Sequence, residues 1–586
     1  MGKWYNEAVF YHMYPLGMTG APKENKEPET VHRLRELFPW IDHLKEIGVT
    51  AIYIGPLFES STHGYDTKDY KKVDRRLGDN EDFKEFVRLA HENGIRVVVD
   101  GVFNHTGREF FAFQDIQKNR EHSPYCSWYK GVNFGWNSPY NDGFGYEAWR
   151  NCFELVNLNL YEQAVRDYLF DVIHFWITEF DIDGIRLDCA DCLTFDFMKE
   201  MRYRTGQWKE DFWLMGEVIH GDYSRWVNGG TLHSVTNYAL HKALYSGHND
   251  HNYFEIAHTV KYLQNMGDLD LYNFVDNHDV ERIYTKLSNK AHFAPVHVLL
   301  YTLPGIPSIY YGSEFGIEGK KEKFSDASLR PALNLEDYKN AVTENPCTAL
   351  IAALGKIRQA TPGLSYGSYN ELMLTNRQYA FARDLNNVRV IVTVNNDDNA
   401  AGMNLPVGNT AAYIGALSGK RAEVQEGRIN VTIPANSGEI WIPEEQMKGE
   451  TPVPAAIPKS VKPDVVMTKE EVADIAAEDS KDPDLLKAET AEKSVESNAE
   501  AAINTTIASE DSETVKTDLT KEESKEAKAP VKPDWSKSPE EMTVAELQAA
   551  ILTKMAGNGP ITDQMKKTVD DNIWHDSLVN WLKSFR

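Results

Sequence analysis

The chain is poor in cysteine, in long apolar runs and in positive charge, and each shortage excludes a class of protein. Its five cysteines in 586 residues are few and odd in number, which is typical of a reducing compartment and not of a disulfide scaffold. No apolar run approaches the roughly 20 residues that a membrane-spanning helix needs. The 88 acidic side chains outnumber the 62 basic ones, so the formal net charge of −26 argues against nucleic acid or an anionic membrane as the main partner.

The amino terminus also lacks the features of a signal peptide. Residues 1–7 lead directly into the strand-like segment 8–14, with no charged and apolar leader before it. We therefore expect a cytoplasmic protein with no membrane partner. The aromatic content of 11% permits sugar stacking, but core packing alone can account for it.

Four short segments carry most of the functional information. They are Asp100–His105 (DGVFNH), Asp183–Asp188 (DGIRLD), Gly216–Val218 (GEV) and Val275–Asp279 (VDNHD). Each follows or contains a short apolar run and ends in charged or amide side chains, as a buried parallel strand does where it reaches the surface. Helix-length amphipathic stretches separate the segments, so the pattern alternates strand and helix.

This alternation predicts an α/β fold, a (β/α)8 TIM barrel, because eight strand–helix units follow one another over about 350 residues. The connection after the third strand is too long for a simple crossover, and we expect a small subdomain inserted there, at about residues 106–160. The expected strands are Val9–Tyr14, Ala51–Gly55, Arg96–Asp100, Gly184–Asp188, Phe212–Gly216, His233–Thr236, Tyr272–Val275 and Ser308–Tyr311.

Three further regions are expected after the barrel domain, which we assign to residues 1–363. Short alternating runs predict a C-terminal antiparallel β-domain, a sandwich, at 364–444. Residues 445–535 have the composition of a disordered acidic linker. Residues 536–586 recover helical periodicity and predict a small helical module, with a capping box that opens a helix at Val544–Met555 and a second helix at about 563–584.

The charged residues at the strand ends point to acid–base and nucleophilic chemistry. Arg186 and Asp188 lie two apart on one strand and face the same side, so the arginine is expected to keep Asp188 ionised, as a nucleophile requires. Glu217 follows apolar residues that would raise its pKa and suit a general acid. Asp279 arrives from the seventh strand. A carboxylate nucleophile beside a carboxylic acid is what retaining glycoside cleavage needs.

These motifs resemble those of the α-amylase family (glycoside hydrolase family 13) over about residues 5–445. The resemblance implies that Asp188 is the nucleophile, Glu217 the general acid/base, and Asp279 the residue that helps to distort and hold the sugar. Asp100 and Asn104 match positions that shape the site. The residues that the resemblance places around the sugar are His63, Tyr65, His105, Arg186, His278, Asp326 and Arg330.

Within that family, the segments DGIRLDCAD and GEVIHGDYSRW look most like the cyclomaltodextrinase, neopullulanase and maltogenic amylase group. The resemblance implies a retaining hydrolase that cleaves α-1,4-glucosidic bonds of maltooligosaccharides or cyclodextrins through a glycosyl-enzyme. A 4-α-glucanotransferase or a trehalose-synthase-like isomerase is the near alternative. A non-catalytic carbohydrate-binding barrel is the second, although the three intact acids oppose it.

The chain also departs from that group. The group's extra N-terminal β-domain has no counterpart before the first expected strand, and residues 155–159 differ from the usual pattern. The α-1,4 or α-1,6 preference, the balance of hydrolysis and transglycosylation, and the oligomeric state therefore stay open.

No cofactor or metal is expected. The one amide of Asn104 does not make a calcium site, because calcium takes six or more oxygen ligands. Cys189 and Cys192 form a C-x-x-C without a second pair, and Cys189 is expected to face away from the site because it follows Asp188 on the strand. Trp574 and Trp581 lie at helical spacing in the terminal module, so that module either packs on itself or docks to a protein partner or to glycogen.

Overall fold

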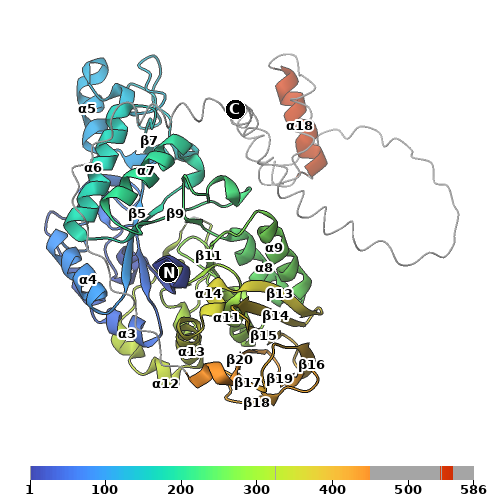
Figure 1. Cartoon of the computed structure of the whole chain (residues 1–586). Helices are drawn as coiled ribbons and strands as arrows, with labels where there is room; N and C mark the ends of the chain where they lie inside the picture. The colour runs from blue at the N-terminus through green and yellow to red at the C-terminus, as the bar shows by residue number, and fades with distance from the viewer. Residues whose placement is uncertain (1, 324, 449–541, 543, 558–586) are drawn as a thin grey trace, which may run out of the picture. The chain divides into compact units, whose positions relative to one another are not determined.

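The computed structural model describes residues 2–323, 325–448, 542 and 544–557 (Figure 1). Its centre is an eight-stranded parallel sheet in the order β10-β9-β8-β5-β2-β1-β12-β11. A parallel bridge between Thr236, just after β10, and Tyr272 of β11 joins the two edges, so the sheet closes. The (β/α)8 barrel is confirmed. Its strands are β1 Phe10–Met13, β2 Ala51–Ile54, β5 Arg96–Gly101, β8 Gly184–Leu187, β9 Trp213–Gly216, β10 Ser234–Val235, β11 Tyr272–Phe274 and β12 Ile306–Tyr310.

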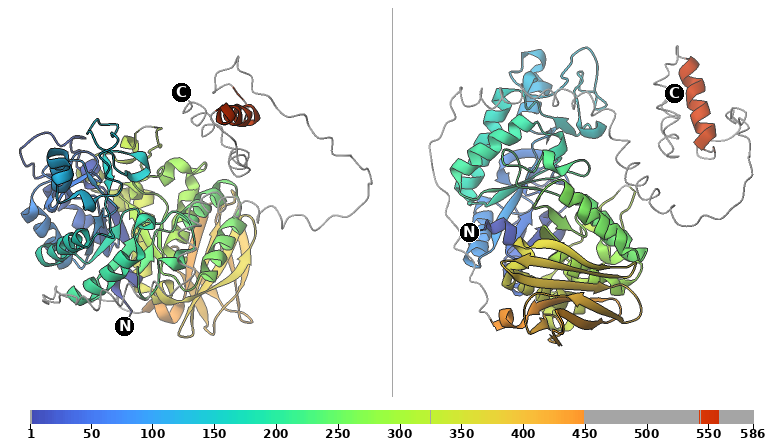
Figure 2. Two further views of the ribbon diagram at one scale, coloured as in Figure 1. Left: turned by 90° about the horizontal axis from the view of Figure 1, so that it is seen from above. Right: turned by 45° about the vertical axis from the view of Figure 1, so that its right-hand side comes forward.

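Amphipathic helices surround this barrel (Figures 1 and 2). Their apolar faces form one continuous core with the outward-facing side chains of the strands, for example Val97 and Val99 of β5. The long helices are α3 Trp40–Glu46, α4 Asn80–Glu92, α6 Gln163–Phe180, α7 Phe195–Trp208, α8 Tyr238–Asn249, α9 Tyr253–Asn265, α11 Phe293–Thr302 and α13 Pro346–Ala360. The short ones are α1 Trp4–Glu7, α2 Pro15–Met18, α10 Ile283–Lys286, α12 Ala341–Glu344 and α14 Pro362–Tyr366.

Two excursions leave the barrel at the carboxyl ends of its strands. The first is an antiparallel pair formed by β3 (Phe58–Ser60) and β4 (Thr67–Val73). The second follows β5 and runs from β6 (His105–Gly107) through α5 (Phe111–Asn119) to β7 (Leu155–Asn157), which pairs with β6. The sequence places an inserted subdomain in this second connection, and both excursions bring side chains to the same end of the barrel.

An antiparallel domain follows the barrel. Its six-stranded sheet has the order β13-β14-β15-β20-β17-β18, and β16 pairs with β19 beside it. The predicted C-terminal β-domain is thus confirmed, and α11 of the barrel packs against β15 and β20. The strands are β13 Ser368–Leu374, β14 Gln378–Leu385, β15 Val388–Asn395, β16 Ala401–Pro406, β17 Ala412–Gly415, β18 Arg421–Glu423, β19 Arg428–Ile433 and β20 Ser437–Pro443.

Little of the remaining chain is described. The predicted linker at 445–535 lies outside the described residues except for its first four positions, and the expected helix at 563–584 lies wholly outside them. A helix, α18 (Val544–Gly557), occupies the place where the capping box predicts one. Among the residues that the structure describes, no helix combines the length and the apolar character needed to cross a membrane.

Candidate active site

The predicted carboxylates gather at the carboxyl ends of the barrel strands. Asp188 directly follows β8 and Glu217 directly follows β9, and Asp279 lies in the loop after β11. In a closed parallel barrel these ends converge on one face, so residues far apart in the sequence become neighbours. Asp188 is buried, whereas the side chain of Asp279 is 36% exposed and faces solvent at the rim.

Arg186 links the buried carboxylates. Its Nη1 donates to Asp100 Oδ1 at 2.8 Å and to Asp188 Oδ1 at 2.9 Å, and its Nη2 lies 2.8 Å from Glu217 Oε2. The guanidinium is 3% exposed, so it neutralises part of the negative charge without competition from water. The expectation that Arg186 and Asp188 share one side of the strand is borne out by this contact.

Asp188 and Glu217 are close together. One carboxylate oxygen of each lies within 4.8 Å of the other and of the Cys189 Sγ. Burial raises the pKa of Asp188, and the neighbouring Glu217 raises it further, whereas Arg186 lowers it. Burial likewise raises the pKa of Glu217, against the opposing effect of Arg186. Arg186 therefore opposes the burial effect on Asp188 without overcoming it, so the aspartate ionises at a higher pH than an exposed one would.

A second group of polar residues, centred on Arg330 and Asp279, lies beside the Asp188–Glu217 pair at the mouth of the barrel. Arg330 Nη2 donates to Asp279 Oδ1 at 2.9 Å and to Asp326 Oδ2 at 3.2 Å, and its Nε donates to the His278 carbonyl at 3.0 Å. His278 Nε2 lies 3.1 Å from Asp279 Oδ2 and 2.5 Å from the Tyr65 hydroxyl. The Tyr65 and His278 rings stack with centroids 5.7 Å apart. The structure thus brings all five residues together.

The remaining two predicted residues differ in their contacts. His105 is buried, and its Nδ1 accepts from the Asn104 amide at 3.2 Å, so its proton lies on Nε2. That Nε2 is buried and has no hydrogen-bond partner of good geometry among the described residues. His63 is peripheral by comparison, because its Nδ1 accepts from the Tyr65 amide and its ring is partly exposed.

The prediction that Cys189 faces away from the site is wrong. Cys189 adopts a left-handed backbone conformation, with φ of +46°, directly after the strand ends. This turn brings its Sγ to 3.2 Å from Asp188 Oδ2 and aims its amide at Glu217 Oε2, 3.1 Å away. The alternation of faces that underlies the prediction holds only while the chain remains extended.

Sequence reasoning also missed supporting residues inside the barrel. The Tyr53 hydroxyl on β2 donates to Asp100 Oδ2 at 2.8 Å, and the His12 ring on β1 stacks on Tyr53 with centroids 4.2 Å apart. Outside the barrel, in the loop after β12, the half-exposed Lys321 Nζ lies 3.4 Å from Asp326 and donates to the Asp279 carbonyl. Tyr53 and His12 sit on strands whose period of two would have placed them inside the barrel, but they lie within apolar runs that carry no charge signal.

Asn104 uses its amide nitrogen in contacts within the site. Its amide nitrogen contacts His105 Nδ1 and lies 3.4 Å from Asn157 Oδ1. The groups of His, Cys, Asp and Glu that could hold a metal in the described part of the chain are Asp188–Cys189–Glu217, whose two carboxylates Arg186 already binds, and His32–Asp79–Asp82, in which Asp82 is buried. With one ligand atom from each of three residues, neither group supplies the six oxygens that calcium takes.

Comparisons with known proteins show what this chain is similar to. The profile of the alpha amylase catalytic domain matches residues 34–356. A cyclomaltodextrinase of Thermoanaerobacter pseudethanolicus is 32% identical over 418 residues, which cover 67% of this chain and 71% of that protein. An intracellular maltogenic amylase of Bacillus subtilis is 30% identical over 342 residues, covering 55% of this chain and 57% of that one. A solved cyclomaltodextrinase structure superposes with a TM-score of 0.67 at 27% identity, covering 75% of this chain and 78% of its own.

Proposed function

We infer the function of this chain from one premise: it belongs to the α-amylase family of glycoside hydrolases. We propose that it is a retaining α-glucan hydrolase, with Asp188 as nucleophile and Glu217 as general acid and base. In the first step an Asp188 carboxylate oxygen attacks the anomeric carbon of the sugar. The glycosidic bond breaks, and the Glu217 proton passes to the departing oxygen. In the second step water attacks the same carbon, its proton passes to Glu217, and Asp188 is released.

The spacing of the two carboxylates is the observation that carries this proposal. Retaining glycosidases hold their carboxyl groups about 5–5.5 Å apart, whereas inverting enzymes leave about 6.5–9.5 Å for a water molecule. The separation of at most 4.8 Å between the nearest oxygens of Asp188 and Glu217 agrees with the retaining geometry. The pKa values, both raised by burial, favour a protonated acid beside an ionised nucleophile, because the two groups disfavour simultaneous ionisation.

The second group of residues is proposed to hold the sugar. Asp279, fixed by Arg330 and His278, offers its exposed carboxylate to sugar hydroxyls. Tyr65 offers a ring face, and the family resemblance places His105 beside the same sugar. Asp326 and His63 complete the set at the rim. Asp100 orients Arg186 and remains out of reach of the sugar.

We propose short α-1,4-linked maltodextrins and cyclodextrins as the substrates. The support is the names of the relatives, cyclomaltodextrinase and maltogenic amylase, together with the motif segments that resemble that group. Transglycosylation is the competing reaction. It uses the same residues, but a sugar hydroxyl attacks the glycosyl-enzyme in place of water.

A product profile on maltoheptaose, β-cyclodextrin, pullulan and soluble starch tests the substrate. We expect rapid attack on the short and cyclic substrates, with starch slower, and no turnover by Asp188→Asn. Asp167→Asn, an exposed helix position that binds Gln163, is the matched control and should retain wild-type rates. Products longer than the substrate would instead assign a transferase. Sugar binding without turnover in the wild type would leave a binding protein.

We also propose a cytoplasmic location and a protein partner for the C-terminal region. The location is supported by the intracellular name of the Bacillus subtilis relative and by the five cysteines, all free in the structure. The partner is suggested by the helical tail beyond a polar linker in the sequence. Deleting residues 446–586 should leave hydrolysis unchanged and remove a co-purifying protein; if localisation and co-purification are both unaltered, the tail has no such role.

A further inference from the structure

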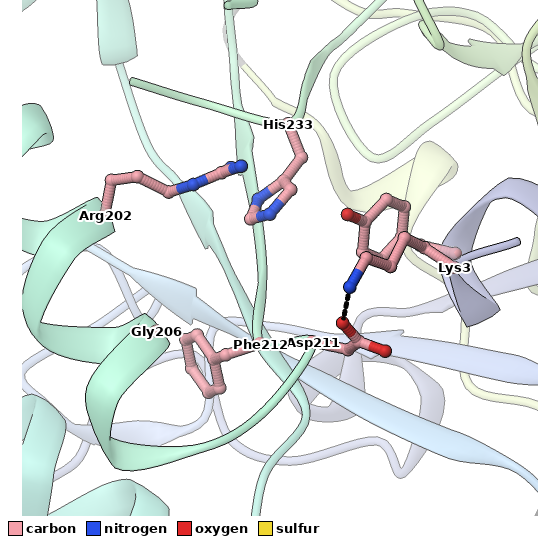
Figure 3. Close-up of a pocket in the computed structure, with 7 residues that line it drawn as sticks. Lys3, Arg202, Gly206, Asp211, Phe212 and His233 are labelled. Carbon is pink, nitrogen blue, oxygen red and sulfur yellow. Dashed lines mark hydrogen bonds and ion pairs between the residues drawn. The ribbon is translucent and has the colours of Figure 1, made fainter. Parts of the chain in front are cut away.

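A cavity of about 170 Å³ lies at the opposite end of the barrel from the carboxylates (Figure 3). Phe212 lines it directly before β9, whereas Glu217 follows the same strand, so the cavity and the active site sit at the two ends of β9. Its other walls come from α1, from α7 and from His233, which precedes β10. A cavity of this size is below the roughly 300–1,000 Å³ typical of drug-sized ligands, so it has room only for a small molecule or ion.

The cavity contains a positive charge without a counterion. Arg202 extends from α7 toward His233, and its buried Nη1 has no hydrogen-bond partner in the described part of the chain (Figure 3). Across the cavity Lys3 and Asp211 pair with each other, so the Asp211 carboxylate is already neutralised. Arg202 is partly buried, and a buried guanidinium nitrogen without a hydrogen-bond partner is unfavourable. A carboxylate or phosphate is the partner that the guanidinium geometry fits.

Two neutral donors accompany the arginine. His233 Nδ1 accepts the Leu214 amide at 2.9 Å, so the ring carries its proton on Nε2. Burial lowers the pKa of His233, which keeps the ring neutral with that single donor. The Tyr5 ring meets the His233 ring edge-on at 4.9 Å, and burial raises the pKa of its hydroxyl to about 12, so the proton stays on the oxygen. Donors from three chain segments suit an anion with several oxygens.

We propose that this cavity binds a small oxyanion, phosphate or a phosphomonoester, through the Arg202 guanidinium and the His233 Nε2–H. The ion joins α1, α7 and the amino ends of β9 and β10. It therefore stabilises the fold at the end of the barrel that the substrate does not reach. The inference is independent of the proposed hydrolysis, because none of these residues belongs to the carboxylate site.

The test is thermal unfolding of the full chain in potassium phosphate against potassium chloride at equal ionic strength. We expect the wild-type Tm to rise with the logarithm of the phosphate concentration, because the ion binds the folded state. Arg202→Gln should lose this rise. Arg88→Gln is the matched control, because this substitution changes the net charge by the same amount. Arg88 is an exposed helix arginine that pairs with Glu85 and Glu92. A sugar phosphate compared with inorganic phosphate then shows which source binds at the lower concentration.

A second variant covers the case in which Arg202→Gln fails to fold. Gly206 lies one turn after Arg202 on α7, lines the same cavity, and has open space where a Cβ would stand. Gly206→Glu places a carboxylate four residues after the arginine, where the two side chains can pair. This variant should be more stable than the wild type in chloride and insensitive to phosphate. No phosphate-specific rise in the wild type, or an equal rise in Arg202→Gln or Gly206→Glu, would overturn the proposal.

Discussion

At the scale of single residues, Arg186 sets the electrostatics of the site. One buried guanidinium contacts Asp100, Asp188 and Glu217, so three carboxylates share one positive charge. Burial raises the pKa of Asp100 to about 6 despite that contact. A site with more carboxylates than cations holds a proton readily, and a general acid requires one.

The first prediction concerns the pH profile. Protonation of Asp188, the proposed nucleophile, should stop its attack. We therefore expect kcat/KM to fall on the acid side at a pH above the ordinary aspartate range, because burial raises the pKa of Asp188. Loss of the Glu217 proton should give the basic limb. Glu217→Gln, assayed on a maltosyl fluoride that needs no protonation of its leaving group, should keep the acid limb and lose the basic one. A basic limb that persists in this variant would remove Glu217 from the acid role.

The second prediction concerns the Cys189 thiol, which positions Asp188 through a weak hydrogen bond. Cys189→Ala should lower kcat/KM about three- to tenfold, because one such bond is worth roughly 0.5–1.5 kcal/mol. Cys189→Ser restores a donor and should recover most of the loss. The pH profile separates positioning from packing: the acid limb should move upward in Cys189→Ala, since the ionised carboxylate loses a donor. Equal losses in both variants with unmoved limbs would mean packing alone.

The residues around Asp188 show what the sequence can and cannot predict. The shared face of Arg186 and Asp188 follows from two-residue alternation inside a strand, and the structure places the two side chains in contact. The raised pKa of Asp188 does not follow from that pattern, because it comes from burial in the closed barrel. The conformation of Cys189 follows from the turn after the strand, which nothing in the local pattern marks. Tyr53 and His12 were missed because their chemistry depends on neighbours that only closure of the barrel supplies.

At the scale of elements, short local signals set the helix ends that hold the strands in place. The Asp79 side chain accepts the amides of Glu81 and Asp82 at 3.0 Å, and the Asp82 side chain accepts the Asp79 amide at 3.1 Å. This capping box begins α4, and Gly94, at φ of +75°, lies just beyond its end. Caps and glycines act over a few residues, so both signals at the ends of α4 lie in the local sequence.

The third prediction concerns this cap. Asp79→Ala should lower the free energy of unfolding by about 1 kcal/mol, since both amides lose their acceptor at the helix start. Asp79→Asn retains an oxygen acceptor and should cost less. Urea denaturation of the two variants beside the wild type measures the difference. A loss in Asp79→Asn equal to that in Asp79→Ala would mean that charge at the helix terminus, and not the cap, carries the effect.

The shape of the loop after β12 could not be predicted from the sequence. Arg282, fully buried, donates to the Leu329 carbonyl at 2.9 Å, and the Tyr311 hydroxyl donates to the Pro331 carbonyl at 2.9 Å. These bonds fix the segment that carries Arg330 against the barrel. Irregular loops have no period, and their shape follows from buried donors elsewhere in the chain, so the sequence suggests the Asp326–Arg330 pair but not how it is held.

At the scale of the whole molecule, the barrel and the β-domain share a buried contact that contains several histidines. His248, His292 and His297 come from the α8 and α11 region, and the His251 ring lies 5.1 Å from His292 and 3.3 Å from Asn396 Oδ1 beyond β15. Burial lowers the pKa of His248 to about 3 and of His297 to about 4. Both rings are therefore neutral in the folded protein near neutral pH.

The fourth prediction follows from the sign of these shifts. A histidine whose folded pKa lies below its unfolded value near 6.5 destabilises the fold as pH falls from about 6.5 toward the folded pKa, because only the unfolded chain takes up the proton. Each such group contributes up to about 1.4 kcal/mol per pH unit. Raised carboxyl pKa values have the opposite effect on stability as the pH falls, and Asp100, Asp188 and Glu217 all have them. The contribution of one histidine is therefore measured by comparing a histidine variant with the wild type. His297→Phe should show a shallower loss of Tm on acidification than the wild type, and an unchanged slope would contradict the assignment.

The central claim is that Asp188 and Glu217 cleave glycosidic bonds with retention. The direct measurement is the anomeric configuration of the first sugar released from maltoheptaose, followed by proton NMR before mutarotation. The separation of at most 4.8 Å between their nearest oxygens predicts that the newly formed reducing end is the α-anomer. A first product with the β-configuration would mean direct attack by water, and the nucleophile assigned to Asp188 would be wrong.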